Sequence, residues 1–142
     1  MKGFRLSVIM LVMSAFFLML LPGCTRNEVA EEWYNKGNDD NDFDKKIEYY
    51  TKAISIDQNF ADAYFERGHV YSYLQKYNKA ILDYNMALSI NKNYTDAYLN
   101  RGVSYRAIGE KEKALADFKE ACKRLKWDAC MELRKLKQNM MN

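Results

Sequence analysis

The sequence contains little proline, glycine or histidine: one proline, six glycines and one histidine among 142 residues. All-β domains need turn-forming residues at short, regular intervals, so this scarcity disfavours a β fold. One histidine cannot supply a histidine pair for zinc, and the chain has no glycine-rich phosphate loop. We therefore expect no enzymatic activity, no metal and no cofactor.

The charges of the chain nearly cancel. Its 22 Lys and Arg and 19 Asp and Glu give a net charge of +3. Lys2 and Arg5 lie in a segment that we expect to be removed. The remaining chain has 20 Lys and Arg against 19 Asp and Glu, a net charge of +1. No basic stripe interleaved with aromatic residues is present, so nucleic acid is not predicted as a partner. The apolar residues, 49% of the chain, suffice for one compact domain.

The N-terminus has the layout of an export signal. After Lys2 and Arg5 comes an apolar run at 6–21. This run of sixteen residues is shorter than the roughly 20 that a membrane-spanning helix needs, which favours a removable signal over a permanent anchor. An uncleaved signal anchor is the alternative.

The apolar run ends in Leu21-Pro22-Gly23-Cys24, which resembles the lipobox of bacterial lipoproteins. The resemblance implies that residues 1–23 are removed and that Cys24, carrying acyl chains such as palmitate, becomes the first of 119 residues (142 − 23). Thr25 after the cysteine favours, by the same resemblance, the periplasmic side of the outer membrane if the cell is Gram-negative. We expect residues 24–30 to form a short tether, in which the six residues after Cys24 reach about 20 Å.

The rest of the chain is organised by a 34-residue unit that occurs twice, at 61–94 and 95–128. At this fixed offset eleven positions are identical, which indicates an internal repeat. Aromatic, glycine and alanine positions recur at helical spacing in each unit, as expected for two antiparallel helices that approach closely at Gly68 and Ala80. The residues of the first unit that recur 34 positions later are Asp62, Ala63, Tyr64, Arg67, Gly68, Tyr71, Lys79, Ala80, Asp83, Ala87 and Lys92.

The pattern resembles the tetratricopeptide repeat. The first unit reads Tyr64-x2-Arg67-Gly68-x2-Tyr71 and then Ala80-x3-Tyr84-x2-Ala87, and the second repeats it with Phe118 in place of Tyr84. The resemblance implies an all-α fold of helical hairpins stacked as a short right-handed solenoid. Arg67 and Arg101 stand where the family usually has Leu, and Lys92 and Lys126 stand where it usually has Pro.

Residues 31–60 resemble a degenerate first repeat. Trp33 and Gly37 keep the aromatic-x3-Gly spacing, but three residues are missing between Gly37 and Phe43. The acidic run at 38–42 fills the gap and predicts a solvated turn with a helix N-cap. Calcium binding is the alternative, although the run lacks the glycine and the final glutamate of a calcium loop.

After the last repeat we expect a turn at 126–128 and a final helix at 129–142, capped by Asp128. Its Met131, Leu133 and Leu136 are predicted to cover the apolar face of the preceding hairpin, as the terminal cap of a repeat array does.

Cys122 and Cys130 are spaced as C-x7-C. In one continuous helix they lie too far apart for a disulfide, whereas a chain reversal between them brings them within range. Export to an oxidising compartment makes a bridge chemically reasonable. The spacing also resembles the cysteine pair of Sel1-like, cysteine-rich helical-hairpin proteins. The alternative is two small buried side chains at a helix crossing.

Arg67 and Arg101 each precede an aspartate, Asp83 or Asp117, by sixteen residues. Across an antiparallel hairpin this offset predicts a polar clasp inside the repeat rather than a ligand-binding pair. The first repeat has no such pair.

Tetratricopeptide arrays bind peptides or partner helices along the face formed by the first helix of each repeat. The resemblance places His69 there, where an ordinary solvent-edge role is the alternative to ligand contact. Asp96 and Asn100 replace the basic residues with which one subclass holds a C-terminal carboxylate, so the face is predicted to suit an amphipathic or weakly basic segment. The alternative is that some of its apolar residues pack on neighbouring helices. The candidate groove residues are Tyr34, Asn38, Asp62, Phe65, Glu66, His69, Ser72, Tyr73, Asp96, Leu99, Asn100, Val103, Arg106 and Ala107.

These features together predict a lipid-anchored interaction scaffold of the cell envelope, whose partner is a protein segment. A peptidoglycan-fragment-binding or cell-wall-active protein and a self-assembling structural unit are the alternatives.

Overall fold

The computed structural model describes residues 26–124 and 126–141, so the predicted signal and Cys24 lie outside the described residues. Within the described ranges the chain is helical and has no strand, which confirms the all-α prediction. None of these helices combines the length and the apolar character that crossing a membrane requires. The helices are α2 (Arg26–Asp39), α3 (Phe43–Ile56), α4 (Ala61–Tyr73), α5 (Tyr77–Ile90), α6 (Thr95–Ala107), α7 (Lys111–Lys123) and α8 (Trp127–Met141).

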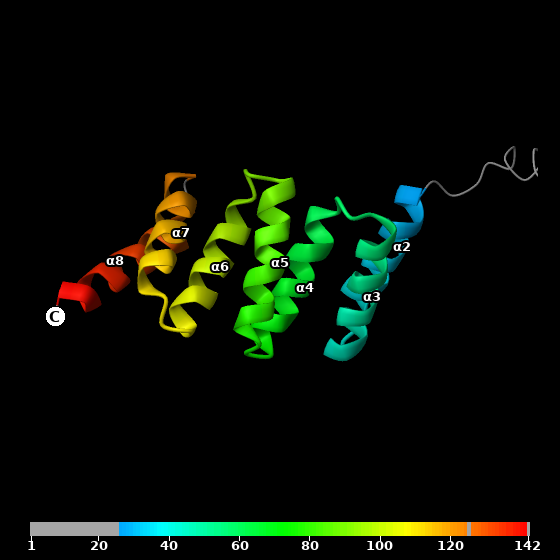
Figure 1. Cartoon of the computed structure of the whole chain (residues 1–142), viewed down its shortest axis with the longest axis horizontal. Helices are drawn as coiled ribbons and strands as arrows, with labels where there is room; N and C mark the ends of the chain where they lie inside the picture. The colour runs from blue at the N-terminus through cyan, green and yellow to red at the C-terminus, as the bar shows by residue number, and fades with distance from the viewer. Residues whose placement is uncertain (1–25, 125, 142) are drawn as a thin grey trace, which may run out of the picture.

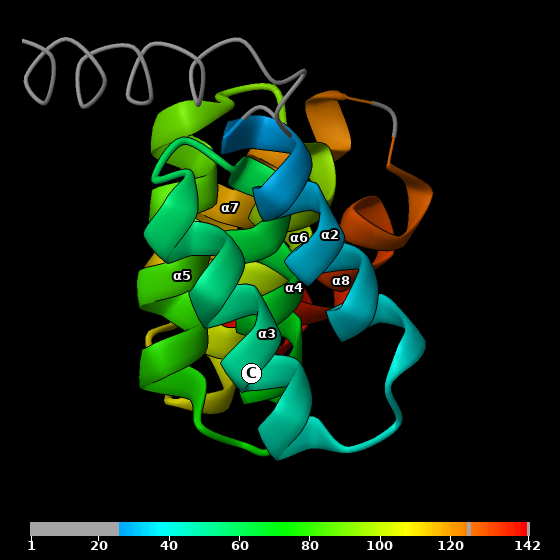
Figure 2. The ribbon, with the colours of Figure 1, turned by 90° about the vertical axis from the view of Figure 1, so that its right-hand side faces the viewer.

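The helices form a row of antiparallel hairpins (Figure 1). Within the row α2 pairs with α3, α4 with α5 and α6 with α7, and α8 packs on α7. Seen along the row, the even-numbered helices lie on one side and the odd-numbered helices on the other (Figure 2). We call the side formed by α2, α4 and α6 the even-helix face.

A glycine in the first helix of each hairpin makes room for a buried ring. A Cβ atom added to Gly102 would lie 2.7 Å from the ring of Phe118, and one added to Gly68 would lie 3.0 Å from that of Tyr84. Both rings are completely buried. Because these distances are shorter than normal carbon contacts, a methyl group would force the helices apart. The glycine–ring pair therefore sets the spacing of each hairpin.

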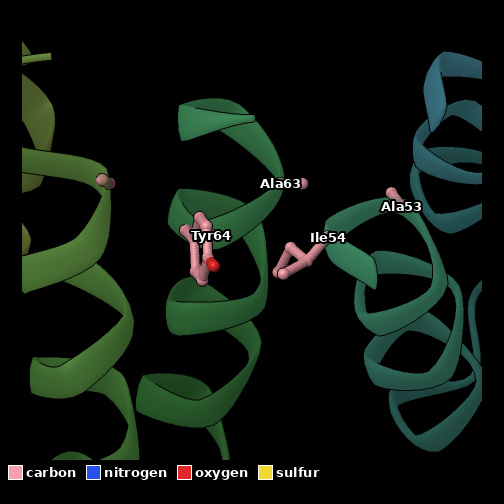
Figure 3. Close-up of a cluster of buried hydrophobic side chains, with 5 residues drawn as sticks. Ala53, Ile54, Ala63 and Tyr64 are labelled. Atoms are coloured by element: carbon pink, nitrogen blue, oxygen red, sulfur yellow. The ribbon is translucent and has the colours of Figure 1, made fainter. Parts of the chain in front are cut away.

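Alanines and aromatic residues also build the core between hairpins. Ala53 and Ile54 of α3 pack against Ala63 and Tyr64 of α4 (Figure 3). All four side chains are buried. Each hairpin thus covers its neighbour, and the stack forms a continuous core.

The first helix of the first hairpin ends two residues after its glycine, whereas α4 continues for five residues after Gly68, as the missing residues predicted. Helix α2 ends at Asp39, and residues 40–42 connect it to α3. The Asp42 carboxylate accepts hydrogen bonds from the backbone N–H groups of Asp44 and Lys45 and so caps α3. Among the described residues no group of three His, Cys, Asp or Glu is arranged to hold a metal ion.

The tether prediction needs correction. Residues 26–30 were expected to be part of a flexible tether, but they form the first turns of α2. Ala30 is buried in the core, and the Arg26 guanidinium donates a hydrogen bond to the carbonyl of Ile56. These contacts make residues 26–30 part of the folded array and not of a tether.

The C-terminal helix begins earlier than predicted. Helix α8 starts at Trp127, and Asp128 lies in its first turn rather than preceding it as a cap. In that position its carboxylate still complements the positive end of the helix dipole. Leu136 is buried against Ala114 and Phe118, as expected for a covering helix.

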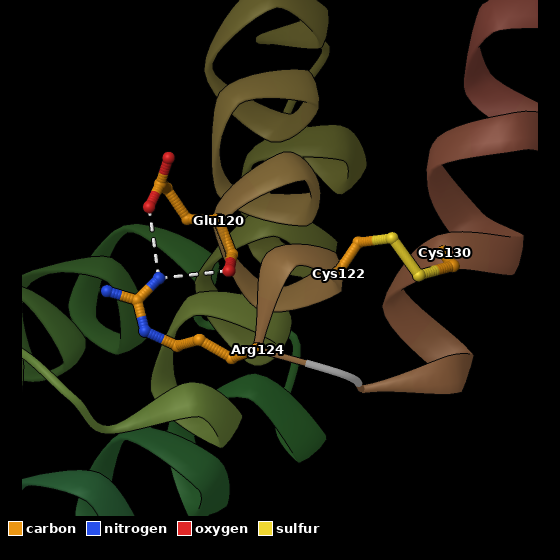
Figure 4. Close-up of a disulfide and its surroundings, with 4 residues drawn as sticks. All are labelled: Glu120, Cys122, Arg124 and Cys130. Atoms are coloured by element: carbon orange, nitrogen blue, oxygen red, sulfur yellow. Dashed lines mark hydrogen bonds and ion pairs between the residues drawn. A yellow bond between two sulfur atoms is a disulfide. The ribbon is translucent and has the colours of Figure 1, made fainter.

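A disulfide joins the last two helices. Cys122 of α7 and Cys130 of α8 are bonded, with their Cα atoms 4.8 Å apart (Figure 4). On the opposite side of α7 from the disulfide, the Arg124 guanidinium donates hydrogen bonds to the carbonyl and the carboxylate of Glu120 (Figure 4). The reversal between the two helices brings the sulfur atoms together.

Candidate functional site

Arg67 holds three helices together. Its Nε and Nη2 atoms donate hydrogen bonds of 2.8 Å to both carboxylate oxygens of Asp83 on α5. Its Nη1 atom donates to the hydroxyl of Thr51 on α3. The Asp83 and Arg67 side chains are only 8% and 16% exposed. Burial alone lowers the pKa of Arg67, but the hydrogen bonds and charge of Asp83 outweigh it and raise the pKa, so the guanidinium stays protonated.

Arg101 repeats this arrangement one unit later. It donates to both oxygens of Asp117 at 2.8 and 2.7 Å and to the side chain of Asn85 on the preceding hairpin. The predicted clasp is confirmed. The link to the preceding hairpin was not predicted, although Thr51 and Asn85 both stand sixteen residues before the arginine that they contact. These arginines therefore join the repeats and are engaged in the fold.

Several predicted groove residues are also engaged in the fold. The Phe65 ring packs against the rings of Tyr84 and Tyr94, with centroids 5.8 and 4.7 Å away. Leu99 and Val103 pack against the cluster around Phe118. The alternative that apolar groove residues pack on neighbouring helices thus describes these three side chains, and their role in binding stays a prediction.

The C-terminal segment engages two further groove positions. The Lys126 ammonium forms an ion pair with Asp96 at 2.7 Å, and Arg106 pairs with Glu132 of α8. Lys126 occupies the position where the repeat family usually has proline, and its charge is used for this contact. The third repeat therefore offers fewer free groups on the even-helix face than the sequence suggested.

Three of the groove residues of α4 lie open. Asp62, His69 and Tyr73 are exposed, and the Tyr73 side chain is 69% exposed. The His69 ring lies parallel to that of Phe65, with the centroids 6.4 Å apart. His69 is therefore at the solvent edge, with one face of its ring stacked and the remainder accessible.

A pocket of about 190 Å³ lies between α3 and α4. Glu66, His69 and Tyr73, three of the predicted groove residues, line it together with side chains that the sequence did not single out: Phe43, Lys46, Tyr50 and Val70. The rings of Phe43 and Tyr73, which both line it, pack against each other with their centroids 4.7 Å apart. We call this pocket the α3–α4 pocket.

Glu66 is the half-buried acid of the α3–α4 pocket. Burial raises the pKa of Glu66 above its ordinary value, and it outweighs the charges of His69 and Lys46, which act in the opposite direction. Lys46 donates hydrogen bonds to the carbonyl oxygens of Gly37 and Asn38, at 2.9 and 3.4 Å. The carboxylate thus carries a charge for which the fold supplies only partial compensation.

A stack of antiparallel helix pairs that leaves aromatic and charged side chains open along one face is a helical-repeat interaction module. Family models described as tetratricopeptide repeat match residues 33–60, 61–94 and 95–124. The chain belongs to the tetratricopeptide repeat family.

Solved structures agree with this assignment, whereas no curated protein matches the chain. The TPR domain of Arabidopsis OM64 is 26% identical, with a TM-score of 0.76 over 81% of this chain and 99% of that one. The first TPR domain of Spaghetti (RPAP3), bound to the HSP90 peptide SRMEEVD, is 28% identical, with a TM-score of 0.68 over 82% and 91%. The second TPR domain of human RPAP3, in complex with an HSP70 peptide, is 25% identical, with a TM-score of 0.64 over 79% and 92%.

Proposed function

We propose that this protein is a scaffold of the cell envelope that binds a peptide or an amphipathic helix of a partner protein on its even-helix face. The fold is that of a protein-interaction module, and similar TPR domains are seen with bound peptides. The observation that carries the proposal is the open side of α4, where Tyr73 and His69 are exposed next to a pocket. Large exposed aromatic side chains beside charged ones are typical of binding surfaces.

The partner differs in charge from the peptides bound by RPAP3. Those peptides end in Glu-Glu-Val-Asp, whereas this face presents the acids Asp62 and Glu66. Asp96, at a position that is basic in the carboxylate-binding subclass, is already paired with Lys126. Like charges across an interface disfavour association, so a weakly basic or amphipathic segment fits better than an acidic C-terminus.

The envelope anchor is the second part of the proposal and rests on the lipobox-like sequence before Cys24. We expect the full chain to incorporate a labelled fatty acid and to sediment with membranes. A Cys24→Ser chain should lose the label and remain unprocessed. Metabolic labelling followed by membrane fractionation measures both. Equal labelling of the two chains would contradict acylation at this residue.

A partner should be captured through the even-helix face. We expect chemical crosslinking in the native cells to join the full chain to a defined envelope protein. In a Tyr73→Ser variant the yield of that crosslinked product should fall at least tenfold. Leu82→Ser is the matched control, because Leu82 is 65% exposed on α5, on the odd-numbered side. Loss of the product with Leu82→Ser alone would place the interface on the opposite side. Binding of muropeptides in calorimetry would instead support the peptidoglycan alternative.

A further inference from the structure

We propose that the α3–α4 pocket is the recognition site for one cationic side chain, a lysine or an arginine, of the bound segment. Glu66 is its counter-ion, and the packed rings of Phe43 and Tyr73 form one side of it. This inference rests on the proposed function, because it names the group of the partner that the even-helix face selects.

The pocket arises because α2 ends soon after its glycine. Helix α2 ends at Asp39, two residues after Gly37. In the second hairpin the helix continues for five residues after Gly68. The missing turn of α2 leaves the start of α3 uncovered where it meets α4. Phe43 and Lys46 are therefore accessible from the even-helix face.

The chemistry of the lining favours a cation. Aromatic faces attract ammonium and guanidinium groups, and the rings of Phe43 and Tyr73, which pack against each other, together line one side of the pocket. Glu66 adds a half-buried carboxylate. The hydroxyl of Tyr50 already donates to Asn38, at 2.9 Å, so it is not available to an anion.

Lys46 is the lysine of the pocket lining, and the fold engages it. Its ammonium donates to two backbone carbonyls at the end of α2. Asp62, one turn before Glu66 on α4, adds negative charge near the Glu66 carboxylate. The surroundings are also acidic, because residues 26–66 carry eleven Asp and Glu against five Lys and Arg, a net charge of −6. This field attracts a basic segment and guides it to the pocket.

The size of the pocket suits one side chain. At about 190 Å³ it is smaller than the roughly 300 to 1,000 Å³ of typical small-molecule sites. We therefore infer an anchor for a residue of a longer segment, with the remaining contacts supplied by the even-helix face.

The test uses three small probes on the full chain in detergent: the N-acetyl methylamides of lysine, norleucine and glutamate. Norleucine has a lysine-like stem without the charge. We expect the lysine probe to shift the NMR signals of His69 and Tyr73, with at least tenfold weaker binding of norleucine and no binding of glutamate. Equal binding of lysine and norleucine, preference for glutamate, or no response to any probe would overturn the cation site.

Glu66→Gln is the decisive variant, with Glu112→Gln on the exposed side of α7 as its control. Glu66→Gln should abolish the lysine response, and Glu112→Gln should leave it unchanged. Burial raises the pKa of Glu66 in the folded chain above its ordinary value of 4.5. Ionisation of Glu66 therefore lowers the free energy of unfolding as the pH rises above 4.5. The Gln variant should therefore be as stable as the wild type or more stable at pH 7, which separates lost binding from lost folding.

The two proposals fail in different ways. If the Glu66→Gln chain still captures the envelope partner while Tyr73→Ser does not, the scaffold stands and the cation site is wrong. If neither variant changes capture, the even-helix face is not the interface, and the proposed function fails with it.

Discussion

An Asp117→Ala variant is expected to lose about 3 kcal/mol of its free energy of unfolding, because removal of one partner leaves a buried charge uncompensated. Asp117 is 7% exposed and receives two hydrogen bonds from Arg101. Without it the guanidinium keeps only Asn85 as a hydrogen-bond acceptor. Urea denaturation of the two chains at pH 7 measures the difference.

The matched control removes both charges. In an Arg101→Met, Asp117→Leu double variant no charge is left unpaired, and most of the lost stability should return. A loss below about 1 kcal/mol for Asp117→Ala, typical of an exposed ion pair, would show that the clasp contributes little to the fold.

Reduction of the disulfide is expected to cost about 2.5 kcal/mol, the value that the chain-entropy model gives for a closed loop of this length. The bridge spans eight positions, from Cys122 to Cys130, and fixes α8 on α7. Cys122→Ser, Cys130→Ser and the double variant should lose the same amount, because each removes the same bond. Denaturation with and without dithiothreitol measures it.

Equal stability of the oxidised wild type and the three variants would contradict a stabilising bridge. Additive losses for the two single changes would indicate that the sulfur atoms contribute by packing, as separate buried side chains do. Hydrogen exchange should show the largest effect in α8, which is held by this bond and by the packing of Leu136.

The hairpins were predictable because the residues that form them repeat at one offset. Gly68 and Tyr84 are a small and a large residue that must meet across a hairpin, and the same requirement produces Gly102 and Phe118 34 residues later. The clasp was predictable for the same reason. Repetition turns a packing requirement into a visible pattern.

The α3–α4 pocket was not predictable in this way. It depends on a deletion, and a deletion removes residues from the pattern instead of adding any. The sequence showed where the three residues are missing. Only the observed end of α2 shows that their absence makes Phe43 and Lys46 accessible. A missing turn before an aromatic residue is the signal that would have indicated it.

The packing of the groove residues was not predictable because family positions specify a helix face and not its neighbours. Phe65 has the groove register, yet Tyr84 and Tyr94 reach its ring. Asp96 and Arg106 are paired with the C-terminal segment, whose path the repeat pattern does not determine. Variants of Phe65 or Leu99 would therefore change the fold as well as binding, and Tyr73 is the better probe.

The most direct test of the account is photo-crosslinking from single positions of the full chain in the native cells. A photoreactive phenylalanine at position 73, on the even-helix face, should give one defined product with an envelope protein. The same group at position 82, which is equally solvent-accessible on α5, should give none. A product from position 82 and none from position 73 would contradict binding on the even-helix face.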